Sequence, residues 1–315
     1  MERKFSWDNS DFTPDDLSPL ARALFGDLEG FQFDLNLYSM SNYAGLFKRL
    51  ATVFYPGHIA EVGVFEARFS SYLMKAFAPR CHSFDFIDVD FRPSAKERID
   101  RCARETGASY QLFEERSADY LRRARAVDWY FIDGDHNYET VREELDAIAR
   151  SADGPRFVIC HDTGWPCARW DGTYCPDGLS NPGDFQPGYL SPFSSRTVDD
   201  YGLEFGHVAG EESAKGSGVL TAVEDFLAAN RDYGHLRFSP FFGLSVLWPR
   251  NRFTDAHNCR IEQFASDPEI YVDFVNKLEL NRVMLLISLQ RAGRVWKKQR
   301  TFINKLRKKL DSRGD

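Results

Sequence analysis

Five short apolar runs dominate the middle of the chain, and each of the first four is followed by a polar turn and a helical pattern. They lie at residues 58–62, 82–87, 109–113, 129–132 and 157–160. Apolar runs of this length, bounded by turn residues, are typical of buried strands, and apolar residues recurring near every fourth position indicate the helices between them. Regular alternation of strand and helix predicts a largely parallel sheet that is covered on both faces.

Two further strands and several helices complete the predicted α/β fold. Residues 236–242 and 243–248 are apolar runs at hairpin spacing, so we expect a seven-stranded sheet with an antiparallel last strand. The remaining helices share the helical spacing of apolar positions and are expected at residues 17–28, 42–54, 94–105, 118–125, 218–228 and 268–310.

The chain divides into three predicted parts. Residues 1–57 form a helical lead-in, residues 58–249 the α/β domain, and residues 250–315 a helical C-terminal extension. The stretch 163–217 is rich in Gly, Pro, Ser and aromatic residues. An insertion this long in a compact domain indicates a lid or binding loop. We interpret it as a cover for a bound substrate, and a surface loop is the alternative.

Composition restricts the possible partners and location. The net charge of −7 argues against a general nucleic-acid-binding protein. No apolar run approaches the ~20 residues of a membrane span, and the charged start lacks an apolar signal core; we therefore expect a cytoplasmic protein. The six cysteines have no close repeated spacing, which disfavours a disulfide framework. Because no Cys-x-x-Cys occurs, a zinc site is also disfavoured.

Polar residues follow two of the expected strands at the point where each strand ends. Asp133, Asp135 and His136 come after the run 129–132, and His161-Asp162 ends the run 157–160. The carboxyl ends of parallel strands form the edge of the sheet at which ligands bind. The sequence thus predicts one acidic, histidine-containing pocket, with an isolated surface turn as the alternative.

The first strand carries a second signal. Gly63 follows residues 58–62 and leads into a helix, which is the arrangement that lets a backbone approach a nucleotide-type cofactor. The absence of Gly-x-Gly-x-x-Gly and of a Walker lysine argues against NAD and ATP. Asp88, at the end of the second strand, is placed to accept hydrogen bonds from ribose hydroxyls.

These residues resemble the class I S-adenosylmethionine-dependent methyltransferases. The resemblance rests on Glu61-Val-Gly63 through Ala67, on Asp88, on Phe131-Ile-Asp-Gly-Asp-His-Asn-Tyr138 and on Val158-Ile-Cys-His-Asp162. It is greatest for a branch with a Phe-Ile-Asp-Gly-Asp-His-x-Tyr signature, which includes O-methyltransferases of sugars and natural products. The resemblance covers residues 42–249 and implies a Rossmann-like methyltransferase sheet.

The resemblance also implies a cofactor, S-adenosylmethionine, and the residues that bind it. They would be Glu61, Gly63, Val64, Phe65, Asp88, Ser117, Ala118 and Asp133, with Ser117 and Ala118 bordering the adenine. In metal-dependent relatives a divalent ion is held at the positions of Asp133, His161 and Asp162. His161 stands where relatives have an acid, which suits manganese better than magnesium, or no metal at all.

The expected chemistry is transfer of a methyl group to a hydroxyl. A sugar hydroxyl is a very weak acid, so a base must remove its proton. His136 suits this role because the ordinary pKa of histidine lies near ~6.5; Asp135 would orient or replace it. Alternatively, His136 only caps the following helix and His161 is structural.

The predicted function is O-methylation of a saccharide or glycosylated metabolite, since aromatic rings in the lid would cover apolar sugar faces. Non-sugar natural products are the alternative acceptors. The rival from another class is a non-catalytic cofactor-binding or assembly module, and an oxidoreductase is disfavoured by the missing glycines. The amphipathic helix 268–310 is expected to pack on a neighbouring subunit, which predicts a homo-oligomer; packing on its own domain is the alternative. The last part of this helix, residues 294–313, is strongly basic. We expect its basic face to be solvated, and contact with an acidic membrane surface is the alternative.

Overall fold

A computed structural model describes residues 17–25, 39–123, 127–150, 154, 156–199, 202–213 and 215–311. The chain forms two compact units, which are described separately. The larger unit is Tyr38–Ile270, and the smaller one combines Met1–Leu37 with Tyr271–Asp315. Within the described residues, the smaller unit holds α1 (Pro19–Phe25) and most of α9 (Pro268–Asp311).

The larger unit is built on one seven-stranded sheet. Its strands are β1 (His58–Val62), β2 (Ser83–Asp88), β3 (Tyr110–Glu114), β4 (Trp129–Ile132), β5 (Phe157–His161), β8 (Tyr233–Phe238) and β9 (Leu244–Pro249), in the order β3-β2-β1-β4-β5-β9-β8. The pairs among β1 to β5 are parallel, whereas β9 runs antiparallel to both β5 and β8. The predicted Rossmann-like sheet with an antiparallel last strand is confirmed.

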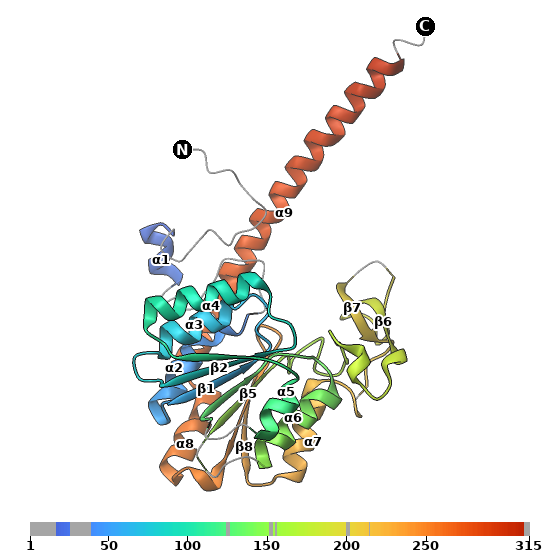
Figure 1. Ribbon diagram of the computed structural model, residues 1–315. Coiled ribbons are helices and arrows are strands. Elements are labelled where there is room, and N and C mark those ends of the chain that lie inside the picture. Colours follow the sequence, from blue (N-terminus) through green and yellow to red (C-terminus); the bar gives the residue numbers. More distant parts are fainter. Residues whose placement is uncertain are drawn as a thin grey trace. The chain divides into compact units, whose positions relative to one another are not determined.

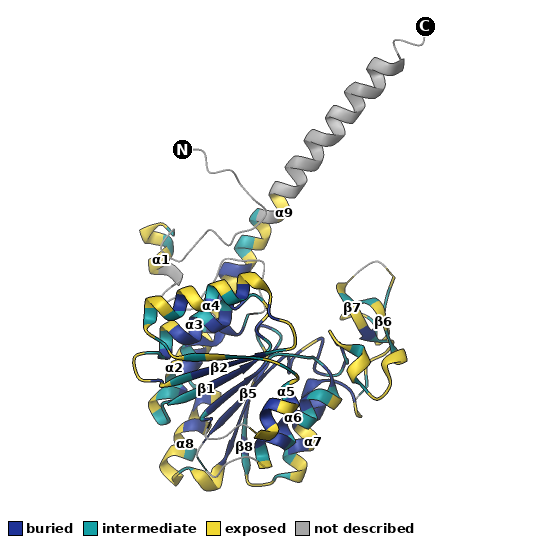
Figure 2. Cartoon of the chain, viewed as in Figure 1, coloured by how far each residue is buried: buried dark blue, intermediate teal, exposed yellow. Residues whose placement is uncertain are grey.

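Helices cover both faces of this sheet (Figure 1). One layer contains α2 (Ala44–Val53), α3 (Arg68–Phe77) and α4 (Pro93–Thr106), and the other contains α5 (Ser117–Arg123), α6 (Tyr138–Arg150) and α7 (Val219–Ala229). Burial on both faces explains why the central strands are continuous apolar runs rather than alternating ones. Figure 2 shows the buried residues concentrated in the sheet and on the inner sides of these helices.

An aromatic cluster fills one side of the sheet and accounts for part of the high phenylalanine content. Phe131 lies 5.2 Å from Phe47 and 5.1 Å from Phe69, and Trp129 lies 5.5 Å from Phe157, measured between ring centroids. Edge-to-face ring pairs at these distances add to the stability gained from burial. Phe47 belongs to α2, so the helical lead-in is part of this core.

The hairpin at the end of the sheet differs from the predicted boundaries. Residues 236–242 were expected to be a strand, but β8 ends at Phe238, and Phe241 and Phe242 lie in a turn with φ of 51° and 66°. Pro240 and Gly243 flank these rings, and both residue types favour turns. The apolar character of the two phenylalanines concealed this turn.

The insertion 163–217 contains structure that the sequence pattern did not predict. It folds into a separate two-stranded antiparallel sheet of β6 (Phe185–Leu190) and β7 (Leu203–Ala209). Trp170, Leu190 and Val208 form a small core of their own beside it. The helix α8 (Asp255–Gln263) was likewise not predicted; it begins after the cap Thr254, whose side chain accepts the backbone N–H of His257.

The remaining ordered segments are short 3-10 helices. They are η3 (Met40–Tyr43), η4 (Pro176–Gly178), η5 (Pro182–Asp184), η6 (Arg250–Arg252) and η7 (Phe264–Ser266). The predicted helix at 17–28 is described only as far as Phe25, and the end of the helix expected at 118–125 also lies outside the described residues.

Candidate active site

The loop after β1 passes very close to the end of β4. Gly63 has a φ of 85°, and a Cβ atom on it would lie 2.2 Å from the backbone oxygen of Asp133. Glycine is therefore the residue that fits this position both conformationally and sterically. The close approach joins β1 and β4 at the point where the strand order reverses direction, which is where open α/β sheets bind ligands.

Asp88 holds the rest of this loop in an unusual conformation. Phe65 and Ala67 both have positive φ, 48° and 57°. The Asp88 Oδ2 atom accepts the backbone N–H groups of Val64 (2.9 Å) and Phe65 (3.2 Å), and Oδ1 accepts that of Asp90 (3.2 Å). Asp88 thus lies beside the glycine loop as expected, and its carboxylate also fixes the loop backbone.

Glu61 is a buried acid beneath the same loop. Its side chain is 1% exposed, and among the described residues Oε2 has no hydrogen-bond partner. Burial raises the pKa of Glu61 well above its ordinary value, and the nearby Asp133 and Asp88 raise it further. Burial thus favours the uncharged form of Glu61, whose Oε2 atom is available for a hydrogen bond with a ligand beside Gly63.

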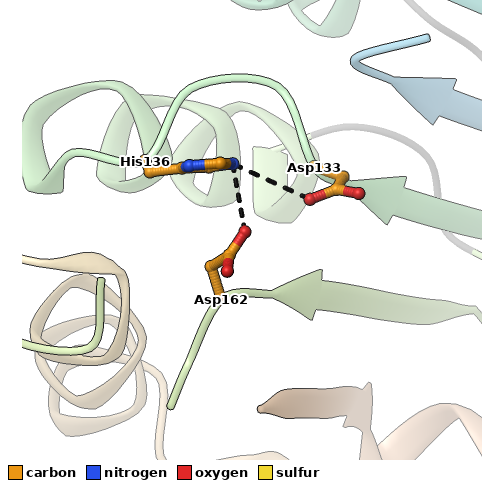
Figure 3. A group of neighbouring side chains, drawn as sticks. All are labelled: Asp133, His136 and Asp162. Carbon is orange, nitrogen blue, oxygen red and sulfur yellow. Dashed lines mark ion pairs between the residues drawn. The ribbon is translucent and has the colours of Figure 1, made fainter. Parts of the chain in front are cut away.

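Asp133, His136 and Asp162 come together at the carboxyl ends of β4 and β5 (Figure 3). The Nε2 atom of His136 lies 3.0 Å from Oδ2 of Asp162 and 3.8 Å from Oδ1 of Asp133. One ligand-type atom from each residue lies within 4.8 Å of the others. Asp162 has a φ of 57°, and an aspartate in this region costs about 1–3 kcal/mol, as is common at functional sites.

Opposite charges balance one another in this cluster. Burial acts to lower the pKa of His136, but Asp162 and Asp133 outweigh it and hold the pKa well above its ordinary value. Burial likewise acts to raise the pKa of Asp162, but His136 and His161 lower it to about 2. Without a further cation, the structure favours an imidazolium–carboxylate pair between His136 and Asp162.

His161 has a different position from the predicted metal ligand. Its Nε2 atom is 2.9 Å from the carbonyl of Phe241, and Nδ1 is 3.0 Å from Oδ1 of Asp133. Both partners are acceptors, so both ring nitrogens carry hydrogen. Burial acts to lower the pKa of His161, but Asp133 and Asp162 raise it to about 10. Because neither ring nitrogen of His161 has a free lone pair, His161 holds Asp133 in place by a hydrogen bond. His136 is the imidazole that could bind a metal ion together with Asp133 and Asp162.

Asp135 faces the insertion rather than His136. Its Oδ2 accepts the side chains of Asn137 and Thr173, both at 2.8 Å, and Oδ1 accepts the backbone N–H of Tyr174 at 2.9 Å. The expected orienting partner of His136 is therefore replaced by Asp162. Asn137 accepts the N–H of Thr140 and so caps α6, a role that one alternative had assigned to His136.

Several hydrogen bonds connect the insertion to the turn between β4 and α6, residues 133–137. Besides the bonds to Asp135, the backbone N–H of Gly172 donates to the carbonyl of His136 at 2.9 Å. The Tyr174 ring lies edge-on to the His136 ring at 5.5 Å and is 72% exposed, while Trp165 is 38% exposed. The exposed ring of Tyr174 thus adjoins the acid–imidazole cluster.

Ser117 and Ala118 begin α5, and Ser117 points inward. Its hydroxyl donates to Oε1 of Glu144, a fully buried carboxyl on α6 that the sequence pattern did not reveal. Among the described residues, Glu144 Oε2 has no hydrogen-bond partner. Burial raises the pKa of Glu144 to about 8. Its position on the inner face of α6, between apolar residues, was the one available sequence signal.

Glu144 predicts a pH dependence of stability. Its folded pKa of about 8 exceeds the ordinary value of 4.5, so stability is fully present below pH 4.5 and is lost as the pH rises toward 8, by about 3–5 kcal/mol. Glu144→Gln cannot titrate. Urea unfolding from pH 5 to 8.5 should show its stability rising relative to wild type by that amount. Glu143→Gln is the control, and a pH-independent difference for Glu144→Gln would contradict the assignment.

Comparison with known proteins agrees with this architecture. Residues 60–163 match a family model described as a methyltransferase domain. None of the curated proteins matches the chain. The similar solved structures include the O-methyltransferase TomG from Streptomyces achromogenes in complex with SAM, at 14% identity over 72% of this chain and 85% of that one, with a TM-score of 0.42.

Two further structures show the same level of similarity. An SAH-bound methyltransferase from Podospora anserina is 13% identical over 75% of this chain and 85% of that one, with a TM-score of 0.42. An O-methyltransferase from Bacillus cereus in complex with SAH is 10% identical over 68% and 84%, with a TM-score of 0.41.

The matched segment contains β1 to β5 and both polar strand ends, Gly63 and Asp133–His136 included. Residues 60–163 are therefore similar to a methyltransferase domain, and the seven-stranded sheet with its antiparallel strand β9 has the Rossmann-like arrangement predicted from the sequence. Across the residues that the structure describes, none of the helices has an apolar stretch sufficient to span a bilayer.

Proposed function

We propose that this protein is an S-adenosylmethionine-dependent O-methyltransferase acting on a hydroxyl of a saccharide or glycosylated metabolite. The observation that carries the proposal is the contact of His136 with Asp162 at the carboxyl edge of the sheet. His136 follows β4, the strand whose end lies against the Gly63 loop. The methyltransferase-domain match supports the reaction type.

The charges around Gly63 suit this cofactor. S-adenosylmethionine carries a sulfonium and an ammonium group, and the carboxylates of Asp88 and Asp133 lie close to Glu61 beside the loop. The buried Oε2 atom of Glu61 has no hydrogen-bond partner among the described residues and is able to accept a bond from the cofactor. Gly63, lacking Cβ, lets the loop lie directly against the end of β4.

His136 is the base in this proposal. As the methyl group leaves the sulfur and bonds to the acceptor oxygen, the O–H bond breaks and His136 takes the proton. Asp162 fixes the ring and stabilises the imidazolium that forms. A sulfonium near these residues disfavours positive charge on His136, so cofactor binding shifts the ring toward its neutral, proton-accepting form.

A divalent cation is an additional element of the proposal. Asp133, His136 and Asp162 offer one nitrogen and two carboxylate oxygens within 4.8 Å, a donor set that fits manganese at least as well as magnesium. Such an ion would acidify a bound hydroxyl. If it binds all three residues, His136 is a ligand and not the base.

The exposed rings of Trp165 and Tyr174 support a glycosylated acceptor, because aromatic faces bind the apolar faces of sugars. The same rings would also suit a planar natural product, which is the alternative acceptor. Tyr174 lies closest to the chemistry, with its ring 5.5 Å from that of His136.

Calorimetric titration with S-adenosylhomocysteine tests the cofactor assignment directly. We expect one site per chain, with binding that does not require an added metal, since Glu61, Gly63 and Asp88 are not among the three residues that could hold an ion. Methyl transfer to glycosides and to phenols, with and without manganese or magnesium, then separates the acceptor classes. Absence of binding at millimolar ligand would overturn the proposal, and binding without transfer to any acceptor would favour a non-catalytic module.

A further inference from the structure

The helix α9 carries a stripe of exposed apolar side chains. It spans Pro268–Asp311, about 66 Å at 1.5 Å per residue. Val275, Leu278, Leu285 and Leu289 are 61%, 42%, 45% and 59% exposed. Other residues of the same helix, such as Phe274, are buried, so the exposed stripe is a second apolar face of the helix.

The stripe has the spacing of a coiled coil. Its four residues are separated by three, seven and four positions, and Arg282 occupies the place between Leu278 and Leu285. Alternating steps of three and four define the a and d positions of a heptad repeat. The same steps continue through the sequence of the helix at Ala292, Trp296, Gln299, Ile303, Leu306 and Leu310. We call the positions from 275 to 310 the seam.

The polar residues of the seam indicate how two such helices would pair. The seam has two of them, Arg282 and Gln299. In a parallel pair, Arg282 would meet its own copy, a like-charge contact in the interface. An antiparallel pair centred between residues 290 and 291 instead sets position 282 opposite 299, because 282 and 299 are equally distant from that centre.

The same antiparallel register pairs the other seam positions from 275 to 306 with one another. It sets Val275 opposite Leu306, Leu278 opposite Ile303, and Leu285 opposite Trp296, and Leu289 faces Ala292; Leu310 would face Tyr271, just outside the seam. Each layer within the seam then contains one a and one d residue, and the two symmetry-equivalent polar layers of Arg282 and Gln299 fix the register.

Charge along the helix favours the same direction. Residues 290–311 contain nine basic residues and one acidic residue, whereas residues 268–289 contain three acidic and two basic residues. Parallel pairing would place two strongly basic halves side by side. Antiparallel pairing places each basic half beside a slightly acidic one, and brings Glu279 near Arg300 at flanking positions.

We propose that α9 binds α9 of a second copy of this chain, as an antiparallel coiled coil along the seam. The occupant of the exposed stripe is thus the same helix in reverse direction. This interface is independent of the cofactor and acceptor assignments, because it rests on residues 275–310 alone.

Light scattering after size-exclusion chromatography tests the pairing in the full chain. We expect about twice the 36.2 kDa chain mass for the wild type. Leu289→Glu should halve that mass, whereas Gln290→Glu, the same substituent on the neighbouring exposed position outside the seam, should leave it unchanged. Unchanged circular dichroism and S-adenosylhomocysteine binding confirm that Leu289→Glu remains folded. A monomeric wild type, or equal behaviour of the two variants, overturns the proposal.

Cysteine cross-linking tests the direction. In a background with the exposed Cys175 and Cys259 replaced by serine, an equal mixture of Val275→Cys and Leu306→Cys chains should form a disulfide-linked dimer that neither variant forms alone. Self-cross-linking of Val275→Cys would show parallel pairing and overturn the antiparallel register. A monomer that sediments with anionic phosphatidylserine vesicles would assign the helix to a membrane surface and overturn the pairing itself.

Discussion

Replacement of His136 by alanine is expected to lower kcat for methyl transfer by about 10²–10⁴-fold, the usual contribution of a positioned general base. The reason is the position of its Nε2 atom, 3.0 Å from Asp162 Oδ2 at the end of β5. Affinity for S-adenosylhomocysteine, measured by calorimetry, should change little, because the acids around Gly63 remain. Turnover is measured with the acceptor identified from the glycoside and phenol panel.

Two further measurements make this prediction specific. His207→Ala changes an exposed histidine on β7 and should retain full turnover. Manganese affinity, measured by electron paramagnetic resonance, distinguishes the two roles of His136. If His136 is the base, the alanine variant should bind manganese as tightly as the wild type does; if His136 is a metal ligand, the variant should bind manganese more weakly. Full turnover of His136→Ala would remove the residue from the mechanism.

Gly63→Ala is expected to produce a large loss of stability for the addition of a single methyl group. The left-handed backbone at Gly63 costs a side-chain-bearing residue about 1–2 kcal/mol. In addition, the new Cβ would lie 2.2 Å from the backbone oxygen of Asp133, so β1 and β4 must separate. We expect a total loss of about 3–5 kcal/mol in the free energy of unfolding, in the range of severe core substitutions, together with loss of cofactor binding.

Gly107→Ala provides the matched control. Gly107 has a similar φ of 71°, but a Cβ there would meet nothing within 4 Å. It should therefore lose only the conformational contribution, about 1–2 kcal/mol, and keep cofactor binding. Urea unfolding of both variants measures the difference. Equal losses would show that the contact between Gly63 and Asp133 has no energetic consequence.

The alternation of strands and helices, and the polar residues at the strand ends, could be predicted from local pattern. The runs ending at Val62, Ile132 and His161 are buried on both faces, so they are continuous apolar segments, and the polar residues after them mark the strand ends. The roles within the pocket did not follow. His136 and His161 look alike in sequence, but one contacts Asp162 at the pocket and the other is held between Asp133 and the Phe241 carbonyl.

The sequence by itself determined the α/β alternation, the glycine turn after β1 and the acid–imidazole edge, because burial and backbone conformation act within a few neighbouring residues. The tertiary structure alone decided that Asp135 ties the insertion down, that Asp162 is the partner of His136, and that Glu144 is buried beside Ser117. These contacts join residues that are 26 to 38 positions apart in the sequence. No local periodicity encodes which of several similar polar groups will meet after folding.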